Sequence, residues 1–214
     1  MALSKVDYNS LNVTAAASKA LKWNSGADGF ETGDVAGALV LLETQTASSD
    51  DTIDFTSNID STYKEYIFKF IDVHPATDAA EFQVNFSVDT GSNYNVTKTS
   101  THARAYHAEA DNAAAFSYSA DGDLAQSTGF QNISHSLNDD NDASTAGTLH
   151  LFDPSSTTFV KHFIINTNSM VDSIYSYHNL FGGYGNTTSA VDAVQFKMSA
   201  GTIDAGVIKL YGIS

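Results

Sequence analysis

Apolar and polar residues alternate in short stretches along most of the chain. In the clearest stretch Phe82, Val84, Phe86 and Val88 are separated by polar residues, among them Ser87. A period of two residues is typical of a β-strand that has one face in the core and the other in water. We therefore predict that these four apolar side chains point into the core and that Ser87 faces the solvent.

Four other stretches have the pattern of strands. Residues 66–73 and 159–165 are apolar at nearly every position, which predicts strands that are covered on both faces. Residues 194–198 and 208–211 alternate with a period of two. Turns rich in Asp, Asn, Gly and Pro separate these stretches. The weaker strand candidates are residues 38–44, 52–57, 97–107, 129–134 and 148–153.

The number and spacing of these stretches predict the fold class. About ten strands follow one another with turns between them, as in sandwiches and barrels. No long helical period lies between them, which argues against a parallel sheet with crossover helices. We predict an all-β protein, an antiparallel β-sandwich of jelly-roll type, over residues 38–214.

The first 37 residues have a different composition. Glycine occurs four times between residues 26 and 37, and residues 14–22 have the propensity for a short helix. The apolar residues are spaced too irregularly for one amphipathic helix and suit an extended segment laid across another surface. We interpret 1–37 as an arm that contacts a neighbouring subunit; the alternative is a first strand and helix packed on the same core. The apolar residues of the arm are Val6, Tyr8, Leu11, Val13, Leu21 and Trp23.

Composition and charge exclude several classes of function. The 214 residues include no cysteine, so disulfides, thiolate metal sites and cysteine nucleophiles are absent. With 25 acidic and 10 basic residues the net charge is −15, which argues against nucleic acid or an anionic membrane as a partner. No apolar run approaches the roughly 20 residues of a membrane span. No secretory signal follows the first residue, so we expect folding in a cytoplasm.

One acidic run is a candidate metal site. Asp139, Asp140 and Asp142 lie within four consecutive residues, and calcium prefers such oxygen-rich loops. The order of ligands in an EF-hand is missing, because Ala143 stands at the third alternating position and no glycine follows at the sixth. A solvated turn is the favoured interpretation, with calcium as the alternative. No other cofactor is expected.

Candidate catalytic residues do not form a known signature. The seven histidines are spread along the chain without a metal-binding spacing, although His102, Arg104 and Tyr106 are expected on one strand face. Structural or surface roles are favoured for the histidines over a metal or trimer-axis cluster. Residues 182–185 are glycine-rich but precede no helix, so we interpret them as a flexible loop or a strand kink. The prediction is a protein that is not an enzyme.

Tyrosines near turns or on polar strand faces are the remaining chemical clue. Tyrosine rings stack on sugars, and tyrosine is also common at protein interfaces, which is the commoner case. These residues are Tyr94, Tyr106, Tyr118, Tyr175, Tyr177, Tyr184 and Tyr211.

Several sequence segments in predicted strands and turns resemble those of structural proteins of tailed bacteriophages, many of which come from marine sources. The segments are residues 61–68, 74–78, 104–107, 124–130, 149–156 and 206–213. The resemblance extends over about residues 38–214 and includes no catalytic signature. It implies a virion component that is made in the host cytoplasm, with a role in capsid decoration, tail or fibre.

We therefore expect a virion structural protein that acts by self-association and by docking onto other virion proteins. The expected assembly is a homo-oligomer, a trimer or larger. The alternative is a carbohydrate-binding adhesin or receptor-binding module that recognises a host-surface glycan through exposed Tyr, Asn and Asp side chains. A third and weaker hypothesis is a glycan depolymerase with paired carboxylates.

Overall fold

The computed structural model describes residues 20–33, 37, 39–172 and 174–213. Within these ranges the chain forms β-strands and no helix, which confirms the all-β prediction. The strands are β1 (Ala20–Trp23), β2 (Phe30–Gly33), β3 (Leu39–Asp50), β4 (Ile53–Phe55), β5 (Glu65–Pro75), β6 (Phe82–Ser87), β7 (Lys98–Ala108), β8 (Ala114–Tyr118), β9 (Gln131–Asn132), β10 (Thr145–Phe152), β11 (Lys161–Val171), β12 (Tyr175–Gly185), β13 (Ala193–Met198) and β14 (Ile203–Ile213).

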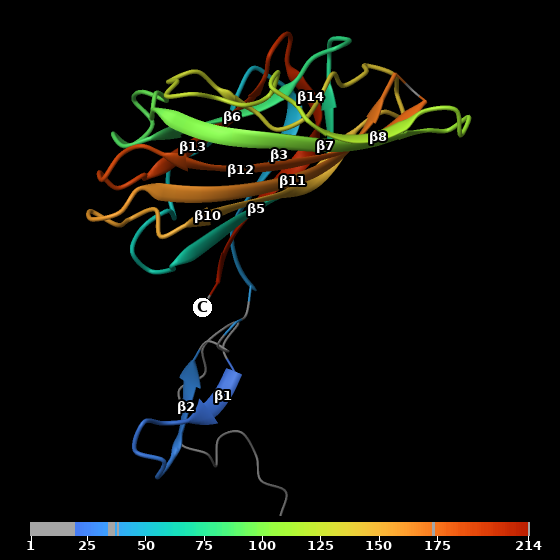
Figure 1. The fold of residues 1–214 in the computed structure, drawn as a ribbon. Coiled ribbons are helices and arrows are strands. Elements are labelled where there is room, and N and C mark those ends of the chain that lie inside the picture. Colours follow the sequence, from blue (N-terminus) through green and yellow to red (C-terminus); the bar gives the residue numbers. More distant parts are fainter. Residues whose placement is uncertain (1–19, 34–36, 38, 173, 214) are drawn as a thin grey trace, which may run out of the picture.

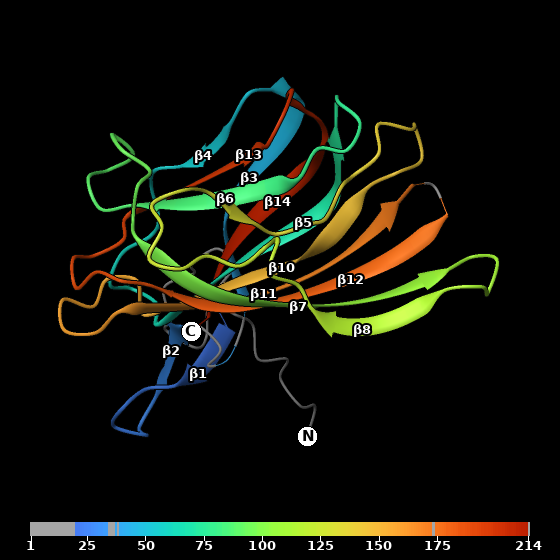
Figure 2. The same ribbon diagram turned by 45° about the horizontal axis from the view of Figure 1, so that its top comes forward.

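Two antiparallel sheets form the main body, as predicted for a sandwich. The larger has eight strands in the order β3-β14-β5-β10-β11-β12-β7-β8, and the smaller has four in the order β4-β13-β6-β9. The small sheet lies across one face of the large one (Figure 1). Strands β7 and β8 of the large sheet reach beyond the small sheet (Figure 2). We call the face toward the small sheet the inner face and the opposite one the outer face.

The strand order is consistent with a jelly roll. One half of the large sheet runs β3-β14-β5-β10, and the small sheet runs β4-β13-β6-β9. In both, a strand from the end of the chain lies between two strands from its first half, as two interlocked Greek keys require. Strands β7, β8, β11 and β12 come from two long excursions in the chain, and they widen the large sheet on one side.

Aromatic side chains fill the space between the sheets. Phe196 of β13 lies at the centre, with its ring centroid 6.1 Å from that of Phe55 and 5.3 Å from that of Phe68. Phe70 and Phe82 lie 5.3 and 5.6 Å from the same ring. All five side chains are buried. Edge-to-face and offset pairs at these distances add to the stabilisation that burial provides.

The prediction for residues 82–88 is correct for three of the four apolar side chains and wrong for Val88 and Ser87. Phe82, Val84 and Phe86 are fully buried, as the alternation predicts. Val88 lies beyond the end of β6 and is 37% exposed. Ser87, which was expected in solvent, is fully buried. The alternation therefore identified the strand but not the surroundings of its second face.

Loops cover that second face of β6. The Asn85 side chain, also fully buried, donates from Nδ2 to the carbonyls of Tyr94 at 2.7 Å and Thr128 at 3.0 Å. The Ser87 hydroxyl accepts from the backbone N–H of Asp89 at 3.1 Å and of Gly91 at 3.0 Å. Polar side chains are stable there because hydrogen bonds to loop backbone satisfy them.

The two stretches expected to be covered on both faces differ from that expectation. In β5, residues 66–68 are buried on both faces, but Ile71 is exposed. In β11 the burial alternates, with Phe163 and Ile165 inside and Ile164 54% exposed. Phe159 lies in the preceding turn and is 69% exposed. In these two strands, apolar residues on both faces do not mean that both faces are buried.

The other predicted strands agree with the structure, but one loop prediction is wrong and two strands of the main body were not predicted. Residues 194–198 and 208–211 lie in β13 and β14, and each weaker candidate overlaps a strand. Residues 182–185 belong to the regular strand β12, so the expected loop or kink is wrong. A Cβ on Gly183 would lie 2.5 Å from the Phe163 ring, so glycine permits a close contact between strands there. Strands β8 and β12 lie in segments for which no strand was predicted.

The described part of the N-terminal segment is a hairpin. Strands β1 and β2 pair with each other in a separate two-stranded sheet, below the sandwich in Figure 1. Residues 20–22 are extended, so the helix expected over 14–22 is wrong there. The helix expectation for residues 14–19 falls outside the described residues. Trp23 stacks on Phe30 across the hairpin at 4.4 Å, a cross-strand contact that offsets the weak strand propensity of this segment.

Candidate functional site

The three candidate calcium ligands lie on an exposed turn before β10. Asp139, Asp140 and Asp142 are all exposed. The backbone carbonyl of Asp140 accepts from Ala143 N at 2.8 Å, and Nε2 of His74 lies 3.0 Å from the same oxygen. Among the described residues, no group of three or more His, Asp or Glu side chains is arranged to hold a metal ion. The turn thus has the acidic composition of a calcium loop without its geometry.

Of the six arm residues, two lie in the described part of the chain. Leu21 and Trp23 are on β1 and are 45% and 61% exposed. Phe30 of β2 is 39% exposed, so the hairpin presents apolar side chains to solvent. Val6, Tyr8, Leu11 and Val13 fall outside the described residues.

The inner face of the widened part of the large sheet is polar. His102, Arg104 and Tyr106 share this face of β7, as their spacing predicted, opposite Phe181, Asn179 and Tyr177 of β12. His102 is buried, stacks on Phe181 at 4.0 Å and is hydrogen-bonded through Nε2 to Oδ1 of Asn179 at 3.2 Å. Buried apolar residues therefore give way to buried polar ones along β7 and β12.

Unsatisfied polar atoms gather at the same place. Of the described residues, five have a buried side-chain N or O atom without a hydrogen-bond partner. Four of these atoms lie on β7, on β12 or directly after β8, namely His102 Nδ1, Arg104 Nε, Asn179 Nδ2 and Ser119 Oγ. Buried polar groups are normally paired, so this concentration marks a functional candidate.

Three tyrosines, one histidine and one arginine form a cluster beside these atoms, which we call the tyrosine patch. It consists of Arg104, Tyr106, His135, Tyr175 and Tyr177. Tyr177 stacks on Tyr106 at 5.2 Å and on His135 at 5.1 Å, and Tyr175 meets both tyrosines edge-on. The guanidinium carbon of Arg104 lies 5.6 Å from the Tyr177 ring centroid. All five side chains are half-buried.

Arg104 supplies the positive charge of the patch. Its Nη1 lies 3.2 and 3.1 Å from the two ring nitrogens of His135. Burial, and then the Arg104 charge, lower the pKa of His135. Burial also lowers the pKa of His102. Both imidazoles are therefore neutral at pH 7.

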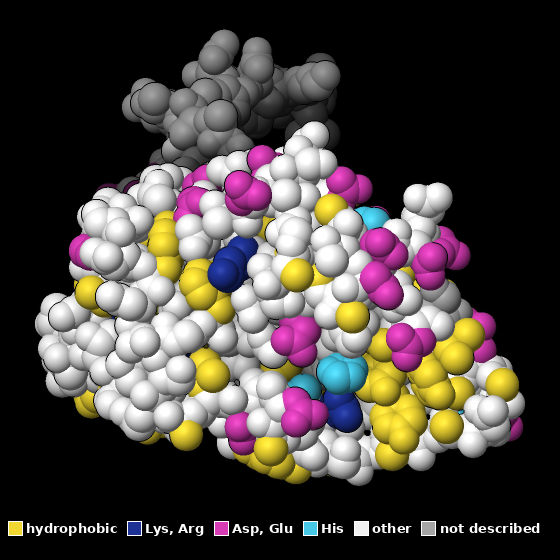
Figure 3. Space-filling model, turned by 90° about the horizontal axis from the view of Figure 1, so that it is seen from above, with side chains coloured by type: hydrophobic (Ala, Val, Ile, Leu, Met, Phe, Trp, Pro, Cys, Tyr) yellow, Lys and Arg dark blue, Asp and Glu magenta, His cyan; other side chains and the backbone are white. Residues whose placement is uncertain are grey.

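The face seen in Figure 3 contains this arrangement. Histidine side chains (cyan) and a basic side chain (dark blue) lie there next to a group of yellow side chains, the colour that includes tyrosine (Figure 3). Acidic side chains (magenta) lie around them (Figure 3). Asp121 and Asp172 are close enough to act on the His135 charge. The patch is therefore a cationic and aromatic surface within an acidic rim.

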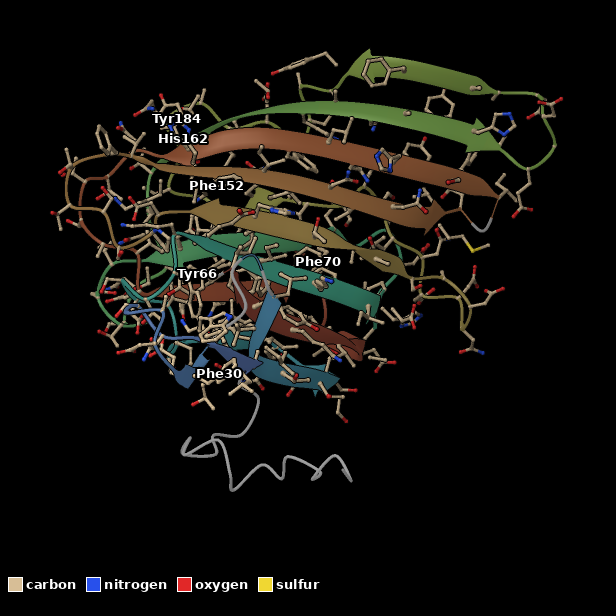
Figure 4. All side chains as sticks on the ribbon, turned by 90° about the horizontal axis from the view of Figure 1, so that it is seen from below. Phe30, Tyr66, Phe70, Phe152, His162 and Tyr184 are labelled. Carbon is tan, nitrogen blue, oxygen red and sulfur yellow. The ribbon has the colours of Figure 1, made fainter. Side chains whose placement is uncertain are left out.

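The outer face of the large sheet is the second candidate surface. None of the five neighbouring strands β10, β11, β12, β7 and β8 contains an Asp or Glu, although the chain has 25 acidic residues. Figure 4 shows this face, with Phe152, His162 and Tyr184 along neighbouring strands. Four large apolar side chains project from it, namely Phe116, Tyr118, Ile164 and Leu180, with exposed fractions of 69%, 59%, 54% and 37%.

A shallow hollow lies in the middle of this outer face. It has a volume of about 490 Å³ and is lined by Ala103, Tyr118, Ile164, Leu180 and Gly182 among others. Gly182, which pairs with Ile164 on one side and Thr101 on the other, adds no side chain between them. A broad, uncharged and partly apolar strand face of this kind is typical of an interaction surface.

The sequence analysis identified some residues of the tyrosine patch and of the outer face. The exposed tyrosines included Tyr106, Tyr175, Tyr177 and Tyr118, but β12 was not predicted, so their grouping did not follow. His135 carried no signal, because it lies on a loop that only the tertiary fold brings over β12. The absence of acids from five strands was visible in the sequence once the strand bounds were known.

Comparison with known proteins gives no relationship for this chain. No protein-family model matches it, and neither a curated protein nor a solved structure matches it. Among the described residues no helix is long and apolar enough to cross a membrane. The functional argument therefore rests on the surfaces themselves.

Proposed function

We propose that this is a non-enzymatic virion structural protein, a capsid decoration or a tail or fibre component, which acts by self-association and docking. The observation that carries the proposal is the outer face of five strands without a carboxylate in a chain of net charge −15. Repulsion between acidic surfaces keeps copies of such a chain soluble and apart from one another. Two copies can come into contact most easily through a face whose strands carry no acidic residues.

The proposed occupant of the outer face is a second copy of the chain. The five strands bring no carboxylate to a contact between two copies of this face, and the carboxylates that reach it, Glu65, Asp111 and Asp123, are hydrogen-bonded to His150, His107 and Tyr118. The rest of the acidic surface repels another copy. Burial of Phe116, Ile164 and Leu180 against a partner removes apolar area from water at roughly 25 cal/mol per Å². Depletion of charge with enrichment of aromatic residues is typical of the centre of protein interfaces.

A second surface supports an assembly larger than a dimer. The β1–β2 hairpin exposes Leu21, Trp23 and Phe30 and pairs with no strand of the sandwich. Two separate contact surfaces on one chain allow trimers and larger rings, or docking onto another virion protein. We propose the arm as the part that contacts a neighbouring subunit.

The virion part of the proposal is supported by the resemblance of residues 61–68, 74–78 and 149–156, among others, to phage structural proteins. Jelly rolls, with which the strand order is consistent, build many viral capsids. The same architecture also hosts lectins, so fold alone does not decide between these roles. The proposed location is the virion, after synthesis in the host cytoplasm.

Charge insertion on the outer face tests self-association. The variant carries Ile164→Asp and Leu180→Asp, and its matched control carries Thr188→Asp, an exposed position in the turn after β12. Sedimentation velocity should show wild type and control as the same oligomer and the double variant as a smaller species, and its circular dichroism spectrum should still be that of the folded β-protein. A monomeric wild type, or a double variant that assembles normally, would contradict the proposal.

Location in a particle tests the virion assignment directly. Mass spectrometry of purified particles, with antibody labelling in electron microscopy, should find the protein on the capsid or the tail. Its absence from particles that form in its presence would contradict the assignment.

A further inference from the structure

The tyrosine patch has the features of a ligand site that the proposed structural role does not require. Arg104 is the one arginine of the chain, and it makes no ion pair with a carboxylate of the described residues. In a chain with 25 acidic residues, an arginine without a carboxylate partner is unexpected. Its Nε is also without a hydrogen-bond partner, so part of the donor capacity of the guanidinium is unused.

The aromatic rings around Arg104 provide a platform. Tyr106, Tyr175 and Tyr177 come from neighbouring strands, and their rings lie within 6.0 Å of one another between centroids. Rigid strands hold the rings, so little conformational entropy is lost when a ligand packs on them. The rings are half-buried, so each retains surface that a ligand can cover.

We propose that the tyrosine patch binds a saccharide that carries a carboxylate. The carboxylate accepts hydrogen bonds from the guanidinium of Arg104, and the sugar ring packs against Tyr106 and its neighbours. Charge-assisted pairs between guanidinium and carboxylate are strong and directional. The apolar C–H face of a sugar ring suits an aromatic surface whose hydroxyl groups also form hydrogen bonds.

The acidic rim decides against a polyanionic ligand. Asp121 and Asp172 lie near His135 and would repel the repeated phosphates of a nucleic acid. The same carboxylates accept hydrogen bonds from sugar hydroxyls, which are donors as well as acceptors. One negative charge surrounded by hydroxyl groups therefore fits this surface better than a chain of charges.

The saccharide site is independent of the proposed self-association. Arg104 and the three tyrosines lie on the inner face of the sheet, whereas Ile164 and Leu180 lie on the outer face. An assembly through the outer face leaves the patch open, so many copies of a weak site would bind a glycan surface with avidity. Loss of assembly and loss of sugar binding are thus separate results.

A glycan array with the purified full-length protein tests the proposal. The array carries oligosaccharides with uronic or sialic acid and their neutral counterparts. We expect retention of carboxylated oligosaccharides, with calorimetry on the strongest ligand showing affinity at least about tenfold above that of its neutral counterpart, about 1.4 kcal/mol. Absence of binding to every carboxylated oligosaccharide, or equal affinity for the neutral ones, would overturn the proposal.

Three variants and one control assign the binding to the patch. Arg104→Gln and Tyr106→Ala should each weaken binding about tenfold or more, whereas Tyr106→Phe, which keeps the ring, should retain it. Tyr184→Ala, a half-buried tyrosine on the outer face, is the matched control and should bind as wild type. Melting temperatures show whether each variant is folded. Full binding by folded Arg104→Gln would overturn the assignment.

Discussion

The two halves of the large sheet face different neighbours, and their inner faces differ accordingly. Under the small sheet, Phe68 and Phe70 of β5 pack against Phe196 in an aromatic core. In the widened half, the equivalent face of β7 and β12 carries His102 and Asn179, both buried. The inner face of one sheet therefore borders a hydrophobic core in one half and a buried polar region in the other.

Strand β11 shows the change along a single strand. Of its six inward residues, all buried, Phe163, Ile165, Thr167 and Ser169 are the middle four, and Lys161 and Val171 lie at the ends. The first two of the middle four belong to the hydrophobic core, whereas the Thr167 hydroxyl donates to the carbonyl of Ile133 at 2.5 Å. A sheet opposite requires apolar side chains, and a loop opposite offers backbone groups that require polar ones. Burial is thus the same in both halves, and the opposing element decides the chemistry.

The largest expected effect is the loss of Phe196 from the core. Phe196→Ala should destabilise the protein by about 3–5 kcal/mol, because it removes a buried ring and leaves a cavity among four other aromatic rings. Urea denaturation followed by circular dichroism measures the change. Val88→Ala, at the exposed end of the same pattern, is the control and should change stability by less than about 0.5 kcal/mol. Equal effects at the two positions would contradict the assigned core.

A smaller effect is expected from a buried polar residue outside the core. Ser87→Ala should cost about 1–3 kcal/mol, since the N–H groups of Asp89 and Gly91 lose their common acceptor. Ser92→Ala, in the same loop but exposed, is the matched control. A Ser87→Ala protein as stable as wild type in urea would show that water replaces the hydroxyl without cost.

Lys98 should make stability rise with pH. Burial lowers the pKa of Lys98 from 10.5 to about 7, while its Nζ donates to Asn85 Oδ1 at 2.5 Å and to the Val96 carbonyl at 2.8 Å. Between these two values the unfolded state binds more protons, so stability increases with pH, by at most about 1.4 kcal/mol per pH unit. Lys98→Met should flatten the rise in denaturation curves between pH 7 and 9. An unchanged slope in this variant would exclude Lys98 as its source.

The smallest expected effect concerns the histidines of the polar region. The pKa values of His102 and His135 are lowered from 6.5 by burial, so the unfolded state takes up protons first as the pH falls. The contribution of these two histidines to stability is complete above pH 6.5 and should decrease below it. Thermal melts from pH 7 to 5 measure the loss, and the double variant His102→Gln, His135→Gln should lose less. A larger acid loss in that variant would reverse the sign argued here.

The strand pattern could be predicted from the sequence wherever alternation is regular. Phe82, Val84 and Phe86 point inward, and Phe196 and Leu210 lie in predicted strands, because a core-facing strand selects apolar residues at every second position. Strand β12 escaped prediction because its inward residues include Tyr175, Tyr177 and Asn179, which do not produce that signal.

The sequence by itself determined the all-β class, the sandwich architecture, the acidic character and the absence of cysteine chemistry, since these depend on local periodicity and composition. The tertiary structure alone decided which polar residues are buried and which surfaces form. Asn85 is satisfied by the carbonyl of Thr128 on a distant loop, and Arg104, His135 and Tyr177 meet although they are separated by many residues. Such contacts depend on strand order and loop placement, which alternation along the chain does not encode.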